Sequence, residues 1–285
     1  MKSYVLLITI VLSIFMACSA QAQTLRTYDD FSGPYIDPLR WLPRNVSSAD
    51  DLWAYEGGFR ILKGKLSYYN LAYGTNLATD GTESMRRQLY LREVSGVTSI
   101  ETSIQIMKNG NKITGCPTPG YPEPSVTRIG FGGSFFNDGS GVLPGNNDYT
   151  GDIFVSIGLV KLSNSTTIPP GYMGVGATVR QCINSDCSDS NPPLFNTSFN
   201  DLFIKFGKKT MLRITLDKGA KRFTFQVGKK IVETYIYPDT LDDSQAPGAA
   251  NGGMRIEVAH YLANCPAGRT GGWADVAFDY VSVSP

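Results

Sequence analysis

Two stretches of the sequence carry side chains whose types and spacing suit the binding of a sugar. In GDIFVSI, every second residue has a polar group or an aromatic ring: Asp152, Phe154 and Ser156. In VTSIETSIQIM, Glu101 and Gln105 take equivalent positions. Carboxylates, amides and hydroxyls can hydrogen-bond to sugar hydroxyls, and an aromatic ring can stack on a sugar ring. We therefore predict that these five residues bind a polysaccharide.

Both stretches have the alternation of a half-buried β-strand. Apolar residues fill the positions between the polar ones, which is typical of strands in antiparallel sheets with one solvated face. If the apolar sets face the core, we expect the two polar sets, together with Ser103, to share one outer face. The loop aromatics Tyr121, Tyr149 and Trp273 would extend that face. An ordinary solvated sheet face is the alternative interpretation.

The rest of the chain also indicates strands. A dozen or more short alternating runs follow residue 25, and no amphipathic helix of ten residues or more interrupts them. The 30 glycines and 16 prolines lie largely between these runs, as turns require. Tight hairpins are expected at Lys218-Gly219 and Gly228-Lys229. The sequence therefore predicts an all-β protein, a two-sheet antiparallel β-sandwich of the jelly-roll type.

The first residues resemble an export signal. Lys2 precedes an apolar run from Tyr4 to Met16, and Ala20-Gln21-Ala22 supplies a small-x-small cleavage site. We expect a signal peptide over 1–22, a single jelly-roll domain over 23–285, and a secreted protein, either extracellular or periplasmic. The alternative is a lipoprotein anchored at Cys18.

The charge balance of the chain limits the kinds of partner that we expect. The 26 basic and 25 acidic residues become 25 and 25 when Lys2 leaves with the signal. This balance favours neither nucleic acid nor an anionic membrane, and no later stretch is long and apolar enough to be a transmembrane segment.

Four cysteines remain after cleavage, which in an exported chain predicts two disulfides with three possible pairings. We favour Cys182–Cys187, which closes a short loop, and Cys116–Cys265.

Three motifs, DDFSG…DPLRW, LKGKL and the C-terminal FDYVSV, resemble in order and spacing the terminal strands of concanavalin A-like jelly rolls. That superfamily includes laminarinase-type glycoside hydrolases of family 16 and laminin-G-like domains, and the middle of the chain is similar to secreted bacterial members without an assigned activity. The resemblance implies that the first and last strands lie close together. Phe31 and Trp41 would then anchor the entering chain in the core.

The hydrolases of this superfamily use a retaining mechanism with two carboxylates about 5 Å apart. Their strand reads Glu-x-Asp-x-x-Glu, whereas here Asp152 is followed by Phe154 and Ser156. One carboxylate cannot perform that double displacement. The single histidine, His260, has no Gly-x-Ser-x-Gly motif to accompany it. We therefore expect a non-catalytic glycan-binding domain; the alternatives are a structural or adhesive cell-surface or matrix protein, and a divergent glycoside hydrolase.

The resemblance also implies a structural calcium ion. Asp279 of FDYVSV matches the aspartate that binds Ca²⁺ in such folds, and Gly64 of LKGKL matches a carbonyl donor. Hard oxygen ligands suit this ion. The alternative is that Asp279 faces solvent or caps a sheet edge.

Overall fold

A computed structural model describes residues 24–47, 55–76, 81–92, 96–119, 121, 123–141, 148–185, 187, 191–248 and 253–285. The expected signal peptide and Cys18 lie outside these residues. Within them the chain forms β-strands, and none of it forms a helix long and apolar enough to cross a membrane.

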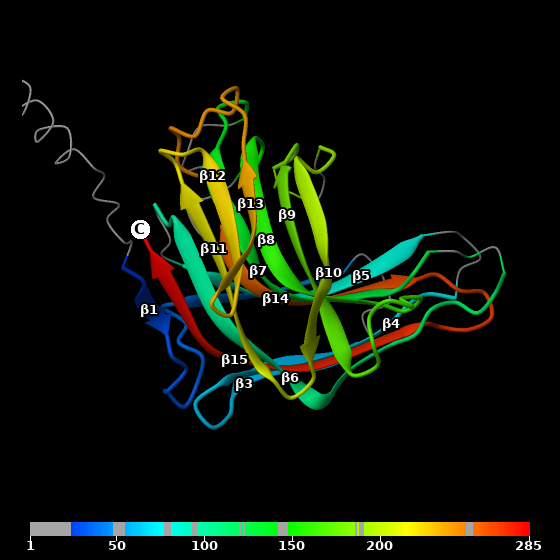
Figure 1. The fold of residues 1–285 in the computed structure, drawn as a ribbon. Helices are drawn as coiled ribbons and strands as arrows, with labels where there is room; N and C mark the ends of the chain where they lie inside the picture. The colour runs from blue at the N-terminus through cyan, green and yellow to red at the C-terminus, as the bar shows by residue number, and fades with distance from the viewer. Residues whose placement is uncertain are drawn as a thin grey trace, which may run out of the picture.

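The strands form two antiparallel sheets, which confirms the predicted sandwich (Figure 1). The eight-stranded sheet has the order β13-β12-β11-β6-β15-β4-β3, and β1 pairs with β15. Its strands are β1 (Arg26–Asp29), β3 (Tyr55–Ile61), β4 (Leu66–Tyr73), β6 (Ser99–Ile113), β11 (Lys209–Asp217), β12 (Arg222–Val227), β13 (Lys230–Ile236) and β15 (Gly271–Ser284).

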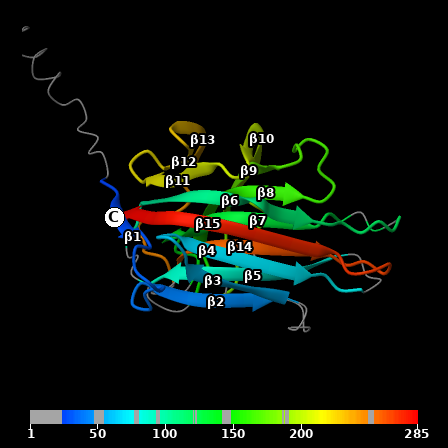
Figure 2. The ribbon, with the colours of Figure 1, turned by 90° about the horizontal axis from the view of Figure 1, so that it is seen from below.

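The seven-stranded sheet has the order β10-β9-β8-β7-β14-β5-β2. Its strands are β2 (Trp41–Ser47), β5 (Thr82–Leu91), β7 (Val126–Asn137), β8 (Asp152–Leu162), β9 (Tyr172–Gln181), β10 (Phe195–Lys205) and β14 (Met254–Ala263). Figure 2 shows the two strand orders running the same way, with β13 and β10 at one side of the view and β3 and β2 at the other. The two predicted hairpins join β11 to β12 and β12 to β13, as expected.

The core lies between the sheets because every second side chain of a strand points toward the other sheet. On β6, Ile100, Ile104 and Ile106 are buried, and on β8, Ile153 and Val155 are buried. All of them belong to one cluster of apolar side chains. The side chains between them point out of the sandwich. The alternation therefore determines which residues are available on the two outer faces.

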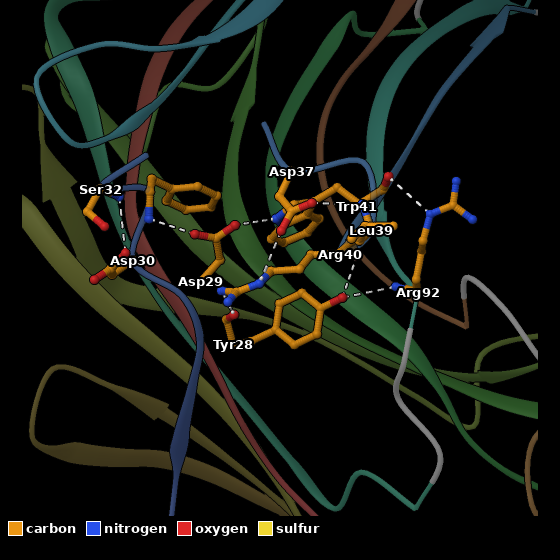
Figure 3. Close-up of polar contacts among 10 residues, drawn as sticks. Tyr28, Asp29, Asp30, Ser32, Asp37, Leu39, Arg40, Trp41 and Arg92 are labelled. Carbon is orange, nitrogen blue, oxygen red and sulfur yellow. Dashed lines mark hydrogen bonds and ion pairs between the residues drawn. The ribbon is translucent and has the colours of Figure 1, made fainter. Parts of the chain in front are cut away.

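The N-terminal motif ties the first strand into this core (Figure 3). The Asp29 carboxylate accepts hydrogen bonds from the Phe31 backbone N–H at 2.8 Å and from Trp41 Nε1 at 2.7 Å. The Phe31 and Trp41 rings stack with centroids 5.8 Å apart, and both side chains are buried. Because β1 pairs with β15, the first and last strands lie side by side, as expected. The prediction for Phe31 and Trp41 is confirmed.

A second set of contacts in the same motif links the two sheets. The Arg40 guanidinium donates to the Tyr28 carbonyl at 2.6 Å, and the Tyr28 hydroxyl donates to the Arg40 carbonyl. The Arg92 backbone N–H donates to the Tyr28 hydroxyl oxygen at 3.1 Å (Figure 3). Tyr28 belongs to β1, whereas Arg40 precedes β2 and Arg92 follows β5. The entering chain therefore bridges one end of the sandwich.

Both predicted disulfides are confirmed. Cys116–Cys265 joins the segment after β6 to the segment after β14, and so links the two sheets. Cys182–Cys187 closes a short loop directly after β9.

Candidate functional site

The two predicted polar sets lie on opposite outer faces of the sandwich. Glu101 and Gln105 belong to β6 in the eight-stranded sheet, whereas Phe154 and Ser156 belong to β8 in the seven-stranded sheet. Because the apolar residues of both strands point inward, their polar residues point away from each other. The expectation of one shared face is therefore wrong. Alternation identifies the residues on one side of a strand, but it does not say to which sheet the strand belongs.

The outer face of the seven-stranded sheet contains a hollow of about 320 Å³. Its size is at the lower end of the range of about 300–1,000 Å³ that is usual for small-molecule sites. Most of its lining comes from β5, β7, β8, β9 and β14. The lining residues are Thr82, Ser84, Arg86, Arg128, Phe154, Ser156, Thr178, Arg180, Cys187, Arg255, Glu257 and Tyr261. We call this the arginine hollow.

Of the predicted β8 set, Asp152 does not line the arginine hollow. Its side chain is buried, and Oδ1 accepts hydrogen bonds from the Gly248 backbone N–H at 2.8 Å and from Asn137 Nδ2 at 3.1 Å. Burial raises its pKa to about 6. Its contacts fasten the segment at Gly248 to the start of β8, so the predicted sugar contact is replaced by a structural one.

Phe154 lines the hollow but presents little open ring surface, since it is only 5% exposed. The guanidinium carbons of Arg255 and Arg180 lie 4.5 Å and 5.0 Å from its ring centroid. The ring also packs with the Cys182–Cys187 disulfide and with Tyr149. Phe154 therefore holds two cations in place by cation–π contacts, and the predicted stacking on a sugar ring is not available to it.

Four arginines from four strands converge on the hollow. They are Arg86 of β5, Arg128 of β7, Arg180 of β9 and Arg255 of β14, and Glu257 is the carboxylate among the lining residues. Four guanidiniums and one carboxylate give these side chains a net charge of +3. The hollow thus has a local excess of positive charge in a protein whose overall charge is close to zero.

A glycine on the neighbouring strand leaves space for the Arg255 side chain in the hollow. Arg255 lies in register with Gly132 of β7, which in turn lies opposite Ser156 of β8. A Cβ atom on Gly132 would stand 2.6 Å from the Ser156 Cβ, closer than such atoms approach. The absence of a side chain at Gly132 leaves space beside Arg255 on this face.

One of the four arginines is fully paired. Arg255 Nε lies 3.2 Å from Glu257 Oε2, and Gln88 Nε2 donates to the same oxygen at 2.9 Å. Arg255 also donates to the Tyr90 hydroxyl at 3.3 Å. Although burial opposes ionisation, Arg255 and then Arg128 lower the pKa of Glu257 to about 2. Glu257 is therefore a carboxylate at neutral pH, and its role is to compensate Arg255.

The other three arginines interact with Glu257 only at longer range. Arg128 donates to the Ser156 hydroxyl at 2.6 Å, and Arg180 lies over Phe154. Arg86 Nε is buried without a hydrogen-bond partner. Across the described part of the chain, none of the three has a carboxylate within 4.0 Å. Burial, with Arg255 and Arg128 nearby, lowers the pKa of Arg180. This part of the hollow therefore has cations in excess of anions.

On the opposite face, Glu101 and Gln105 bind their own neighbours. Glu101 accepts a hydrogen bond from the Tyr280 hydroxyl at 2.7 Å and lies 4.0 Å from Arg213. Gln105 accepts from Lys65 at 3.3 Å and donates to the Gly207 carbonyl at 3.0 Å. Both side chains therefore already have partners within their own sheet, and their contact with a sugar stays a prediction.

The expected calcium ligands do not fit a calcium ion. The Asp279 carboxylate forms ion pairs with Lys209 and, at 3.2 Å, with Lys65. Gly64, in the turn between β3 and β4, has a left-handed φ of 67°. Two ammonium groups thus already occupy the carboxylate, and a divalent cation would have to displace them. Among the residues that the structure describes, no group of three or more His, Cys, Asp or Glu side chains could hold a metal ion.

The remaining candidates are structural. His260 is buried, hydrogen-bonded to Thr127 and to the Asn70 carbonyl, and burial lowers its pKa to about 4. Trp273, expected in a loop, lies in β15.

Sequence reasoning missed the arginine hollow. The signal present in the sequence is that each of the four arginines takes a polar position in a largely alternating stretch: MRRQLYL, TRIGFGG, GVGATVRQ and MRIEVAHY.

No protein-family model and no curated protein matches the chain. Similar solved structures include an endo-acting O-glycanase of the human gut microbiota that initiates mucin breakdown, with 14% identity over 90% of this chain and 97% of the other and a TM-score of 0.44. An endo-1,3-β-glucanase from Streptomyces sioyaensis has 15% identity over 92% and 96%, with a TM-score of 0.42.

The exoplasmic/lumenal domain of VIP36, in a form bound to Ca²⁺ and Man3GlcNAc, has 11% identity over 90% and 89%, with a TM-score of 0.33. The jelly-roll type of sandwich expected from the sequence agrees with the two antiparallel sheets described above.

Proposed function

We propose that this protein is an exported, non-catalytic jelly-roll domain that binds an extracellular glycan in the arginine hollow. The observation that carries the proposal is the hollow itself. Its lining combines hydroxyl groups, guanidiniums and a carboxylate on one sheet face. Such a set can donate and accept several hydrogen bonds, as the many hydroxyls of a sugar require.

Binding without hydrolysis is proposed because of the state of the carboxylates. Glu257 is ion-paired with Arg255, and its pKa of about 2 prevents it from acting as a general acid at neutral pH. Asp152 is buried and hydrogen-bonded outside the lining. A retaining hydrolase needs one carboxyl group as a nucleophile and another as an acid, and these two residues do not provide that pair.

The proposed export is supported by the two disulfides, since such bonds persist in oxidising compartments. The export signal over 1–22 remains a prediction from the sequence. Calcium is not part of the proposal, because lysines pair with Asp279.

A substitution that fills the hollow tests the proposal. Thr178 lies on β9 in the lining, and Thr224 lies on β12 with its side chain on the outer face of the other sheet. Wild type, Thr178→Trp and Thr224→Trp are compared for retention on a panel of immobilised neutral and acidic polysaccharides. We expect wild type and Thr224→Trp to bind the same members, and Thr178→Trp to lose that binding. If wild type binds no member of the panel, or if Thr178→Trp binds as wild type does, the proposal fails.

A further inference from the structure

We propose that the glycan bound in the arginine hollow is acidic, and that Arg86, Arg128 and Arg180 bind an oxyanion substituent of a sugar, either a sulfate ester or a carboxylate. This inference rests on the proposed function and specifies its ligand. It comes from the mismatch between cations and anions among the lining residues.

The first step is the separation of the four arginines into two groups. Arg255 has its own carboxylate, amide and hydroxyl partners in Glu257, Gln88 and Tyr90. In this network a carboxylate balances the charge of the guanidinium. The other three arginines have weaker contacts. Arg128 donates to a serine hydroxyl, Arg180 lies over an aromatic ring, and Arg86 has a buried Nε atom without a hydrogen-bond partner.

The second step is the energetic meaning of that difference. A partly buried cation without an anion is unfavourable, because it has lost water without gaining a countercharge. The lowered pKa of Arg180 has the same cause. An anion placed among the three guanidiniums would relieve this penalty. A neutral sugar would leave it in place.

The third step is the choice of anion. A guanidinium presents planar, paired N–H donors that match the oxygens of a carboxylate or of a tetrahedral oxyanion. The hollow of about 320 Å³ has room for one substituted sugar rather than a folded partner. Ser84, Ser156 and Thr178 lie in the same lining and can hydrogen-bond to the hydroxyls of that sugar.

The probes for the test are a sulfated galactan, polygalacturonate, neutral laminarin and neutral dextran, with single-stranded DNA as a polyanion without sulfate or carboxylate. Affinity is measured for wild type, Arg128→Gln, Arg180→Gln and Arg180→Lys. The matched control is Arg222→Gln, which removes the same charge from an exposed ion pair in the other sheet. Melting curves select the variants that are folded.

Wild type should bind the sulfated galactan, polygalacturonate or both, and bind the neutral polymers at least about tenfold more weakly. Arg128→Gln and Arg180→Gln should each weaken acidic binding about tenfold or more, since each removes a charged hydrogen-bond donor. Arg180→Lys should retain part of the affinity, and Arg222→Gln all of it. The two acidic probes distinguish a sulfate ester from a carboxylate.

The other results separate this inference from the proposed function. Binding of a neutral polymer that Thr178→Trp blocks, but that Arg128→Gln and Arg180→Gln leave unchanged, would overturn the acidic ligand and keep glycan binding. Equal weakening by Arg222→Gln, or equally tight binding of single-stranded DNA, would indicate general electrostatic attraction and would also overturn the inference. An absence of binding to every polysaccharide would remove both.

Discussion

On the outer face of the eight-stranded sheet, two carboxylates have cationic partners close by. In the hollow on the outer face of the seven-stranded sheet, the cations outnumber the anions. Asp279 has two lysine partners, and Glu101 has Arg213 and the Tyr280 hydroxyl. In the arginine hollow, one carboxylate lies among four guanidiniums. The comparison supports the proposal that the outer face of the seven-stranded sheet binds an anionic ligand. It also shows that net charge, +1 for the whole chain, says little about local charge.

The largest expected effect comes from breaking the single ion pair in the hollow. Glu257→Gln leaves Arg255 buried without a countercharge, so we expect a loss of about 3–5 kcal/mol in the free energy of unfolding. Glu101→Gln on the other face should cost about 1 kcal/mol, because Arg213 is 4.0 Å away and partly exposed. Urea unfolding at pH 7 measures both. Equal losses would contradict the difference between the faces.

The same pair predicts a pH dependence. Arg255 and Arg128 hold the pKa of Glu257 at about 2 in the folded protein, below its ordinary value of 4.5. Its stabilisation should therefore be complete above about pH 4.5 and disappear as the pH falls toward 2. The difference between wild type and Glu257→Gln should shrink over that range. A difference that stays constant from pH 6 to pH 2 would refute this assignment.

The two disulfides provide the next comparison, because only one of them lies at the hollow. Cys116–Cys265 joins residues 149 apart, and its removal as a double Ser variant should cost about 3–5 kcal/mol. Cys182–Cys187 joins residues 5 apart, and its removal should cost about 2 kcal/mol. Since the second bond packs against Phe154, its loss should weaken glycan binding more than the loss of the first. Unfolding and binding are measured on both variants, and the reverse order of binding losses would contradict the account.

A smaller effect is expected at Asp152, beside the hollow. Burial raises its pKa from 3.8 to about 6, so its contribution to stability is present below about pH 4 and is lost as the pH rises through about 6. Asp152→Asn should therefore be about as stable as wild type at pH 3 and about 1–2 kcal/mol more stable at pH 7. The asparagine carbonyl can still accept from Gly248. A gain that is the same at both pH values would be evidence against a perturbed carboxyl group.

The smallest effect is expected on the paired face. Asp279→Asn removes partly exposed ion pairs with Lys65 and Lys209, and it should change the free energy of unfolding by about 1 kcal/mol or less. EGTA should leave the Tm of wild type unchanged, because ammonium groups already compensate the carboxylate. A Tm that falls with EGTA in wild type but not in Asp279→Asn would restore the calcium site.

Local features of the fold could be predicted from the sequence. Alternation placed Ile100, Ile104 and Ile153 in the core because a strand turns every second side chain the same way. The terminal motifs placed Phe31 and Trp41 in the core, where both rings lie. Each of these predictions depends only on residues that lie close together in the sequence, either within one strand or within one short motif.

The candidate site could not be predicted in the same way, because it depends on strand order. Gln88 and Glu257 form one hydrogen bond across 169 residues of sequence. Arg86, Arg128, Arg180 and Arg255 meet only because β5, β14, β7, β8 and β9 are consecutive in the sheet. An alternating stretch indicates that its arginine lies on the polar side of a strand, but it does not tell which other strand lies beside it. The sequence therefore did not reveal that the four arginines meet.

The most direct test of the central claim is to observe the three guanidiniums themselves. Nε–H signals of ¹⁵N-arginine-labelled protein are recorded by NMR while oligosaccharides of a sulfated galactan, of polygalacturonate and of laminarin are added separately. The account predicts that an acidic oligosaccharide shifts the signals of Arg86, Arg128 and Arg180, while Arg222 stays unchanged and laminarin has no effect. If laminarin shifts the same three signals equally, or if an acidic oligosaccharide binds without moving them, the arginine hollow is not a site for acidic glycans.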